Sequence, residues 1–260
     1  MHSLLGVWLS IFLLEHLFTN STAALYFRDS GSSFIRLVNQ IHETPFLIVV
    51  EVVFLAFPFV LHALWGIYYL WTAKQNSMVV SKHDVALPQY KRNRAYTWQR
   101  ITAMFLVPAI LLHVYHMRFY RYPLEEGDHQ YVVRVYDDKA LQGVVEKLQG
   151  RLLPTTVEPK MHLEKGQVLA ELPSFGAATY LNVRDTFKSP AMVLLYSLFV
   201  VAAAFHGFNG FWTFLISWGV TISRRAQNWS KVVTNGLMLL VMAFGLFSIW
   251  GTYWTFVFQT

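Results

Sequence analysis

The chain has 260 residues, of which 55% are hydrophobic and 17% aromatic, while only 14% are charged. So little charge excludes an ordinary soluble globular protein and indicates a polytopic membrane protein. The net charge of +6 is better explained by basic loops that set membrane topology than by a nucleic-acid partner, so none is expected. The absence of cysteine excludes disulfides, iron–sulfur ligation and the thioether attachment of a c-type haem.

Five windows of the sequence are apolar over roughly the 20 residues that a membrane span needs. We therefore predict an all-α membrane protein, a bundle of five transmembrane helices in a single domain over residues 1–260. No cleavable signal peptide is expected, because the first apolar run starts at once and has no basic n-region. The expected spans are 3–24, 46–73, 97–120, 190–222 and 232–258.

The connection 121–189 between the third and fourth spans is too long and too polar to be a simple linker. Within it, "QYVVRVY" (130–136) alternates as a short strand does, and "DKALQGVVEKLQG" (138–150) carries the apolar stripe of a helix. We predict a small extramembrane insertion, in which no catalytic motif is found.

Basic residues set the expected orientation. The connections 74–96 and 223–231 are rich in lysine and arginine, whereas 25–45 holds only Arg28 and Arg36. The positive-inside rule then places the N-terminus in the cytoplasm and the C-terminus outside. The membrane that the chain crosses is expected to be the inner (cytoplasmic) membrane of the cell. The basic residues on the predicted inner side are Lys74, Lys82, Lys91, Arg92, Arg94, Arg224, Arg225 and Lys231; those on the outer side, which oppose this orientation, are Arg118, Arg121, Arg184 and Lys188.

Each of the first four spans carries a histidine inside its apolar run, and the fifth has none. A single intramembrane histidine is more often a packed, hydrogen-bonded residue than a ligand. Four of them, one per helix, favour ligation, and a pair of imidazoles in a dry interior is the usual ligand set of a b-type haem. The four residues are His16, His62, His113 and His206.

Depth in the membrane predicts how the four histidines pair. His62, His113 and His206 lie 16 residues past the expected starts of their spans, and His16 lies 13 past Ser3. Alternate spans run in opposite directions, so His16 and His113 fall in the outer half and His62 and His206 in the inner half. Two pairs at two depths predict two haems. His116, one turn further out than His113, is the competing ligand.

Other residues near the ligands have two interpretations. Gly66, Gly207 and Gly210 allow close backbone approach, to haem or to a neighbouring helix. Trp98, Gln99 and Arg100 at the start of the third span offer groups for the propionates of the inner haem, although Arg100 also fits a topological charge.

An ordered set of segments carries a family resemblance: "HSLLGV…FLLEHL", "PFLIVVEVVF…LHALWGIY", "WQRIT…LHVYHMR" and "FHGFNGFWTF…WGVTISRRAQ". Together they resemble the dihaem cytochrome b subunit of succinate:quinone oxidoreductases, in the form with a single five-helix anchor. The resemblance covers about residues 2–256. It implies that His16 and His113 bind the outer haem iron and that His62 and His206 bind the inner one.

The resemblance also implies a function. The chain would anchor a flavoprotein subunit and an iron–sulfur subunit of succinate dehydrogenase or fumarate reductase. It would pass electrons between the iron–sulfur subunit and menaquinone or another quinone through two b haems. This chain would supply the quinone-reactive part of the enzyme and no dicarboxylate site.

Glu51 is the candidate for proton transfer linked to the quinone. It lies 11 residues before His62, about three turns, so both would share a helix face, with Glu51 nearer the level of His16 and His113. A structural hydrogen bond is the alternative. Glu15 and Glu43 are weaker candidates.

Two other classes of protein stay open. A cytochrome b anchor of a hydrogenase or formate dehydrogenase would also carry paired histidines, and a non-haem proton-coupled transporter would use them as a proton relay. A haem spectrum separates both cytochromes from the transporter, and the co-purifying subunits separate the two cytochromes.

Overall fold

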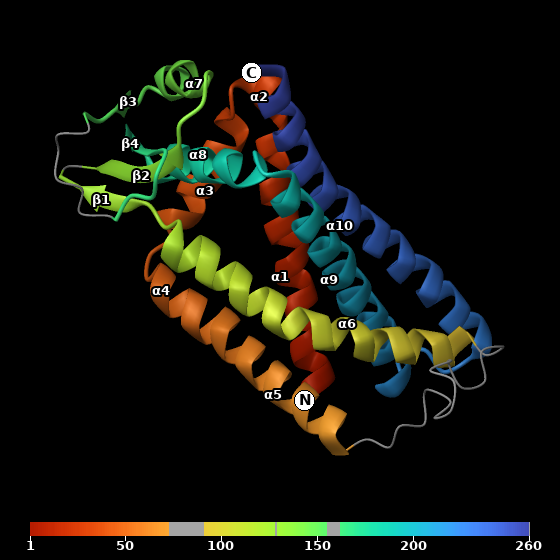
Figure 1. Cartoon of the computed structure of the whole chain (residues 1–260). Helices are drawn as coiled ribbons and strands as arrows, with labels where there is room; N and C mark the ends of the chain where they lie inside the picture. Colours follow the sequence, from red (N-terminus) through yellow and green to blue (C-terminus); the bar gives the residue numbers. More distant parts are fainter. Residues whose placement is uncertain (73–90, 128, 155–161, 260) are drawn as a thin grey trace. The chain divides into compact units, whose positions relative to one another are not determined.

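The computed structural model of the chain describes residues 1–72, 91–127, 129–154 and 162–259 (Figure 1). Lys74 and Lys82, two of the residues used to predict topology, lie outside these ranges. In the described part of the chain, five helices are long and apolar enough to cross a membrane. They are His2–Leu25, Leu47–Thr72, Arg92–Tyr120, Pro190–Ser217 and Arg224–Phe258.

These helices confirm the five predicted spans and correct some of their ends. The third and fifth helices begin several residues earlier than predicted, because basic and polar residues continue the helix beyond the apolar run. The fourth ends at Ser217, since Gly219 adopts a left-handed φ of 72° that stops an α-helix.

The spans are built from regular and irregular segments. The regular helices are α1 (His2–Ser21), α4 (Leu47–Val50), α5 (Phe57–Thr72), α6 (Lys91–Val114), α9 (Pro190–Ser217) and α10 (Arg224–Gln259). A 3-10 segment, η1 (Thr22–Leu25), extends the first span, and π-helical segments interrupt the second (η2, Glu51–Ala56) and end the third (η3, Tyr115–Tyr120).

Two short helices, α2 (Tyr26–Asp29) and α3 (Ser32–His42), follow the first span. The chain reverses between them at Gly31, whose φ of 82° favours glycine. Asp29 then fixes the start of α3, because its carboxylate accepts hydrogen bonds from the backbone N–H groups of Gly31 (2.9 Å) and Ser33 (3.0 Å).

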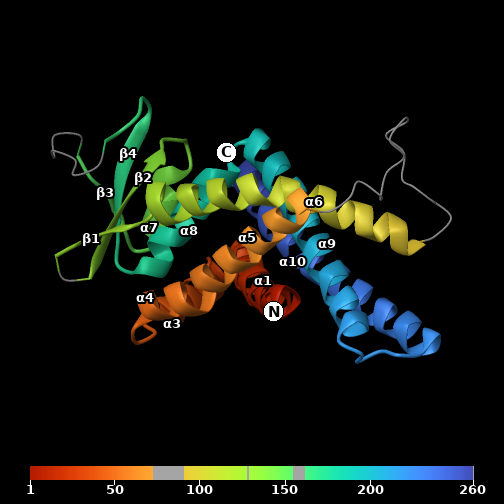
Figure 2. The same cartoon turned by 90° about the horizontal axis from the view of Figure 1, so that it is seen from below.

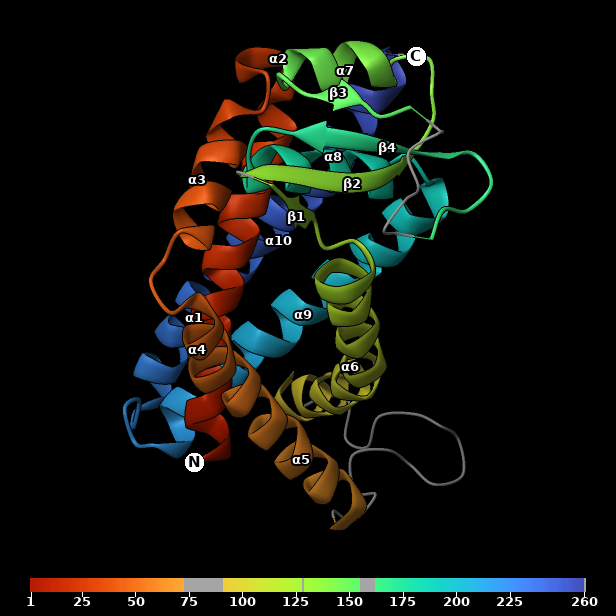
Figure 3. The same cartoon turned by 90° about the vertical axis from the view of Figure 1, so that its left-hand side faces the viewer.

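The predicted insertion between the third and fourth spans contains a four-stranded antiparallel sheet in the order β1-β2-β4-β3 (Figure 3). Its strands are β1 (Leu124–Glu126), β2 (Gln130–Tyr136), β3 (Arg151–Leu152) and β4 (Gln167–Leu172). The predicted strand is β2, with the same bounds, and the predicted helix is the shorter α7 (Leu141–Lys147). The chain is thus mostly helical, as expected, with a small sheet outside the spans.

Helix α8 (Phe175–Phe187) is the core of this insertion. It packs against α3 and β2, beside the sheet as seen in Figures 1 and 2, and most of its side chains are buried. Gly176 allows the close approach to α3: its N–H donates to Asn39 Oδ1 (2.7 Å), and a Cβ there would lie 2.4 Å from the Ile35 carbonyl oxygen.

The chain divides into two compact units. The division falls inside α1, α6, α9 and α10, so each of these helices contributes to both units. Unit 1 comprises Met1–Glu15, Ile48–Leu111 and Phe199–Ala243, and unit 2 comprises His16–Leu47, Leu112–Leu198 and Phe244–Thr260. His62 and His206 therefore belong to unit 1, and His16 and His113 to unit 2. The single domain over 1–260 stays a prediction.

Candidate metal centres

The histidine pair of unit 1 joins α5 and α9. The rings of His62 and His206 are 6.2 Å apart between centroids, at an interplanar angle of 86°. Both side chains are half-buried.

Each ring of this pair is held through its Nδ1 atom. His62 Nδ1 lies 3.1 Å from the backbone oxygen of His2, and His206 Nδ1 lies 3.3 Å from the backbone oxygen of Gln99. The Thr102 hydroxyl is a second neighbour of His206 Nδ1, at 3.4 Å. A carbonyl oxygen only accepts, so the proton of each imidazole sits on Nδ1 and Nε2 is the nitrogen with the lone pair.

Contacts of His62 reveal two residues that the sequence analysis did not select. The ring of His2 stacks on that of His62, with centroids 4.1 Å apart and planes 6° from parallel. Gly6 lies against the same ring, since a Cβ at Gly6 would be 3.1 Å from His62 Cε1. No signal in the sequence separates this glycine from one that merely packs against a helix.

The three residues assigned to the propionate side differ in their surroundings. Gln99 fixes the backbone at His206, because its Nε2 donates to the His206 carbonyl oxygen (2.9 Å) and its Oε1 accepts from Asn209 Nδ2 (2.7 Å). Trp98 is 52% exposed. Arg100 Nη1 is buried and has no hydrogen-bond partner in the described part of the chain.

The glycines predicted near the inner ligands pack against other side chains of unit 1. A Cβ at Gly207 would lie 3.1 Å from Ser10 Oγ, one at Gly210 3.2 Å from Gln99 Nε2, and one at Gly66 3.6 Å from His2 Nε2. Gly207 thus serves helix packing, whereas Gly66 and Gly210 leave room for His2 and Gln99, which contact His62 and His206.

The histidine pair of unit 2 joins α1 and α6. The rings of His16 and His113 are 5.9 Å apart between centroids, at 77°. His113 Nδ1 lies 3.3 Å from the hydroxyl of Tyr196 in α9, and the same hydroxyl lies 3.4 Å from His116 Nδ1. The ring that contacts His16 is that of His113, the predicted partner. The sequence analysis missed Tyr196, whose only signal is a polar hydroxyl within an apolar span.

The spacing of both pairs fits one metal ion between two imidazoles. Metal–imidazole bonds of about 2.0–2.1 Å put the two nitrogens roughly 4 Å apart and the ring centres about 6 Å apart. The separations of 5.9 and 6.2 Å agree with this. Metal-bound histidines also donate their other N–H to a nearby acceptor, as the Nδ1 contacts of three of these four rings allow.

Glu51 is half-buried in unit 1 and begins the π-helical segment η2. The expectation that it shares a helix face with His62 assumed a regular α-helix, and that assumption is wrong. A π turn holds more residues than an α turn, so the eleven-residue spacing no longer returns to the same face. Glu15 and Glu43 are exposed.

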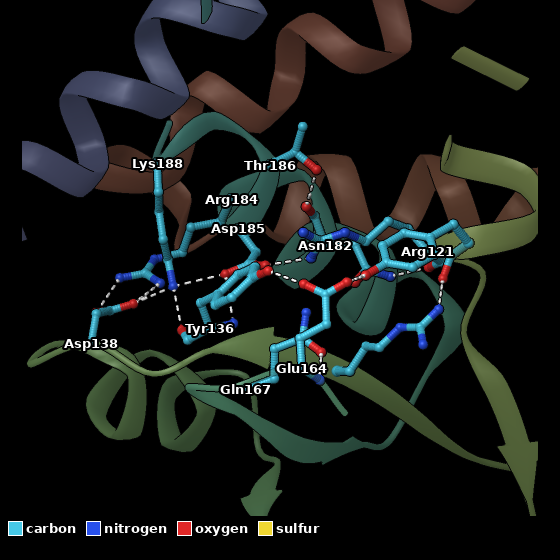
Figure 4. Close-up of polar contacts among 12 residues, drawn as sticks. Arg121, Tyr136, Asp138, Glu164, Gln167, Asn182, Arg184, Asp185, Thr186 and Lys188 are labelled. Atoms are coloured by element: carbon cyan, nitrogen blue, oxygen red, sulfur yellow. Dashed lines mark hydrogen bonds and ion pairs between the residues drawn. The ribbon is translucent and has the colours of Figure 1, made fainter. Parts of the chain in front are cut away.

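A buried polar cluster connects the end of the third span with the insertion (Figure 4). Asp185, whose side chain is fully buried, pairs with Arg121 and with Lys188. Arg184 donates two hydrogen bonds, of 2.9 and 3.0 Å, to Asp138, which also pairs with Lys188. Burial alone would raise the pKa of Asp138, but its bonds and charges with Arg184 and Lys188 outweigh burial and lower it to about 2.

Three of the four basic residues that opposed the predicted orientation belong to this cluster. Arg121, Arg184 and Lys188 each pair with a buried or partly buried carboxylate, so the folding of the insertion gives them a structural role of their own.

Fold and sites define a multi-pass helical membrane protein with two pairs of histidines inside its spans. The chain is 26% identical over 250 residues to the succinate dehydrogenase cytochrome b558 subunit of Bacillus subtilis (strain 168), an alignment that covers 96% of this chain and 93% of that protein. It is a homologue of that subunit. No family model matches the chain, and no solved structure matches it.

Proposed function

We propose that this chain is the membrane-anchor cytochrome b subunit of a succinate:quinone oxidoreductase. In this role it holds two b haems, one between His62 and His206 and one between His16 and His113. The observation that carries the proposal is the spacing of the two ring pairs, 6.2 and 5.9 Å. Similarity to a succinate dehydrogenase cytochrome b558 subunit over nearly the whole chain supports it.

Haem, when bound, supplies one-electron transfer between a partner iron–sulfur subunit and a membrane quinone. The residues of this chain bind and orient it. Backbone oxygens of His2 and Gln99 fix the tautomer of His62 and His206, which leaves the Nε2 lone pair of each ring available to bind the haem iron.

Arg100 would pair with a haem carboxylate. Its Nη1 is buried with no hydrogen-bond partner in the residues described, and a buried guanidinium nitrogen is costly unless it meets an acceptor. Trp98, which is exposed, and Gln99, which is bonded to the His206 backbone, complete the proposed propionate side.

Glu51 would accept a proton from quinol. Its side chain is half-buried within a membrane span, and π-helical segments such as η2, which Glu51 begins, occur frequently at functional sites. The quinone is menaquinone or another membrane quinone.

The N-terminus is assigned to the cytoplasm and the C-terminus to the outside. Exposed basic residues at the starts of the third and fifth span helices support this orientation: Arg92, Arg94, Arg224 and Arg225. A flavoprotein and an iron–sulfur subunit would bind on the cytoplasmic side.

The test is a haem assay on the purified complex. We expect about two non-covalent haems per chain, one for each pair of histidines, together with co-purifying flavoprotein and iron–sulfur subunits. Replacement of His62 or His113 by alanine should each remove one haem, while His116→Ala should keep both. A preparation without haem would refute the proposal, and partner subunits of another class would redirect it to a different respiratory complex.

A further inference from the structure

The hydroxyl of Tyr196 lies between two histidines of the third span. Its Oη is 3.3 Å from His113 Nδ1 and 3.4 Å from His116 Nδ1. All three residues belong to unit 2, and the histidines are one helical turn apart, on either side of the start of η3.

Aromatic packing holds the phenol ring in place. Its centroid lies 5.7 Å from the His113 ring at 73° and 5.4 Å from the Phe187 ring at 87°, both edge-to-face contacts. The His116 ring stacks on Tyr120, with centroids 6.1 Å apart and planes 19° from parallel. The three polar atoms are therefore fixed by side chains that are themselves packed.

Hydrogen-bond chemistry gives the contacts a direction once His113 binds a metal through Nε2. The proton of its neutral imidazole must then sit on Nδ1, which donates to Tyr196 Oη. A hydroxyl has one proton, so Tyr196 donates that proton to His116 Nδ1. The result is a directed chain from His113 through Tyr196 to His116.

We infer that Tyr196 is a positioning residue for the outer haem ligand, and that His116 acts behind it by polarising the Tyr196 hydroxyl. This inference rests on the proposed function, because it takes His113 as a ligand. An acceptor on Nδ1 makes an imidazole a stronger donor to the metal and stabilises the oxidised form. Tyr196 thereby lowers the potential of one haem and leaves that of the other unchanged.

The experiment compares four variants in the assembled complex by redox titration and by electron paramagnetic resonance of the oxidised haems. His113→Ala first identifies which signals belong to the outer haem. Tyr196→Phe, which keeps the ring and its packing, should retain both haems, shift the outer haem to a higher midpoint potential and move its low-spin resonance. His116→Ala should shift the same haem in the same direction by less.

Tyr115→Phe is the matched control, since Tyr115 lies next to His116 in sequence but is 60% exposed, and it should change neither haem. If Tyr196→Phe prevents assembly, His116→Ala decides the matter by the shift of the outer haem. Wild-type complex without haem would overturn the proposed function and this inference with it. The inference alone would be overturned if Tyr196→Phe retained two haems and the midpoint potential of the outer haem did not change. Where Tyr196→Phe does not assemble, the same result in His116→Ala would overturn it.

Discussion

Asp185 should be the most sensitive residue of the extramembrane insertion. Its side chain is fully buried and forms ion pairs with Arg121 and with Lys188 (2.9 Å). It also accepts a hydrogen bond from the backbone N–H of Tyr136 (3.0 Å). Asp185→Asn keeps the size and one acceptor oxygen but removes the charge. Arg121, 7% exposed at its side chain, would then lack its carboxylate.

The size of the effect follows from burial. Removing one partner of a buried ion pair costs about 3–5 kcal/mol, and the retained Tyr136 contact favours the lower end of that range. An exposed pair is worth only about 0.2–1 kcal/mol. The side chains of Arg151 and Glu171 are 72% and 16% exposed, so this pair reaches solvent through its arginine and is closer to the exposed kind, which makes Glu171→Gln the matched control.

Hydrogen–deuterium exchange reports the loss locally. A cost of about 3 kcal/mol should speed exchange through local opening on the order of 100-fold in β2 and α8, against less than about fivefold for Glu171→Gln. Equal exchange in the two variants would refute the view that the buried cluster stabilises the insertion.

Three further predictions concern the sites and the insertion. Gly6→Ala should displace the His62 ring and lower the retention of one haem, whereas Gly236→Ala, where a Cβ meets nothing within 4 Å, should keep both haems; equal retention would contradict the role of Gly6. Glu51→Gln should assemble with both haems and keep succinate oxidation by a soluble dye, yet lose most quinone turnover; normal turnover would remove Glu51 from the mechanism. Because the pKa of Asp138 is lowered from 3.8 to about 2, its contribution to stability is present above about pH 4 and is lost as the pH falls through 2. The check is the stability of wild type and of Asp138→Asn, measured by unfolding as the pH is lowered. If wild type loses none of its stability relative to the variant, this prediction is contradicted.

The membrane spans could be predicted because a bilayer demands long apolar runs, which are local in sequence. The pairing of the four histidines also followed from local counting, since alternate spans reverse direction. Both predicted pairs lie close in the structure, His62 with His206 and His16 with His113.

The partners of these histidines could not be predicted. Gln99 and His206 are 107 residues apart in sequence, and Tyr196 and His113 are 83 apart, so only the packed structure brings them together. The π-helical segment at Glu51 could not be predicted for another reason. It changes the number of residues per turn, on which every argument from periodicity depends.

The two pairs differ in the group that accepts the hydrogen bond from a histidine Nδ1. This difference determines which substitution can remove that hydrogen bond. In the pair of unit 2 the acceptor of His113 is a side chain, Tyr196, which a single substitution removes. In the pair of unit 1 the acceptor of His62 is a backbone oxygen, that of His2, which no substitution of that side chain deletes. In an α-helix the residue four positions after a carbonyl lies beside it, and here that residue is Gly6. A side chain at Gly6 would stand 3.1 Å from the His62 ring, so the glycine is what lets the imidazole reach the carbonyl. The sensitive position for the His62 tautomer is therefore Gly6, which bears no polar group at all.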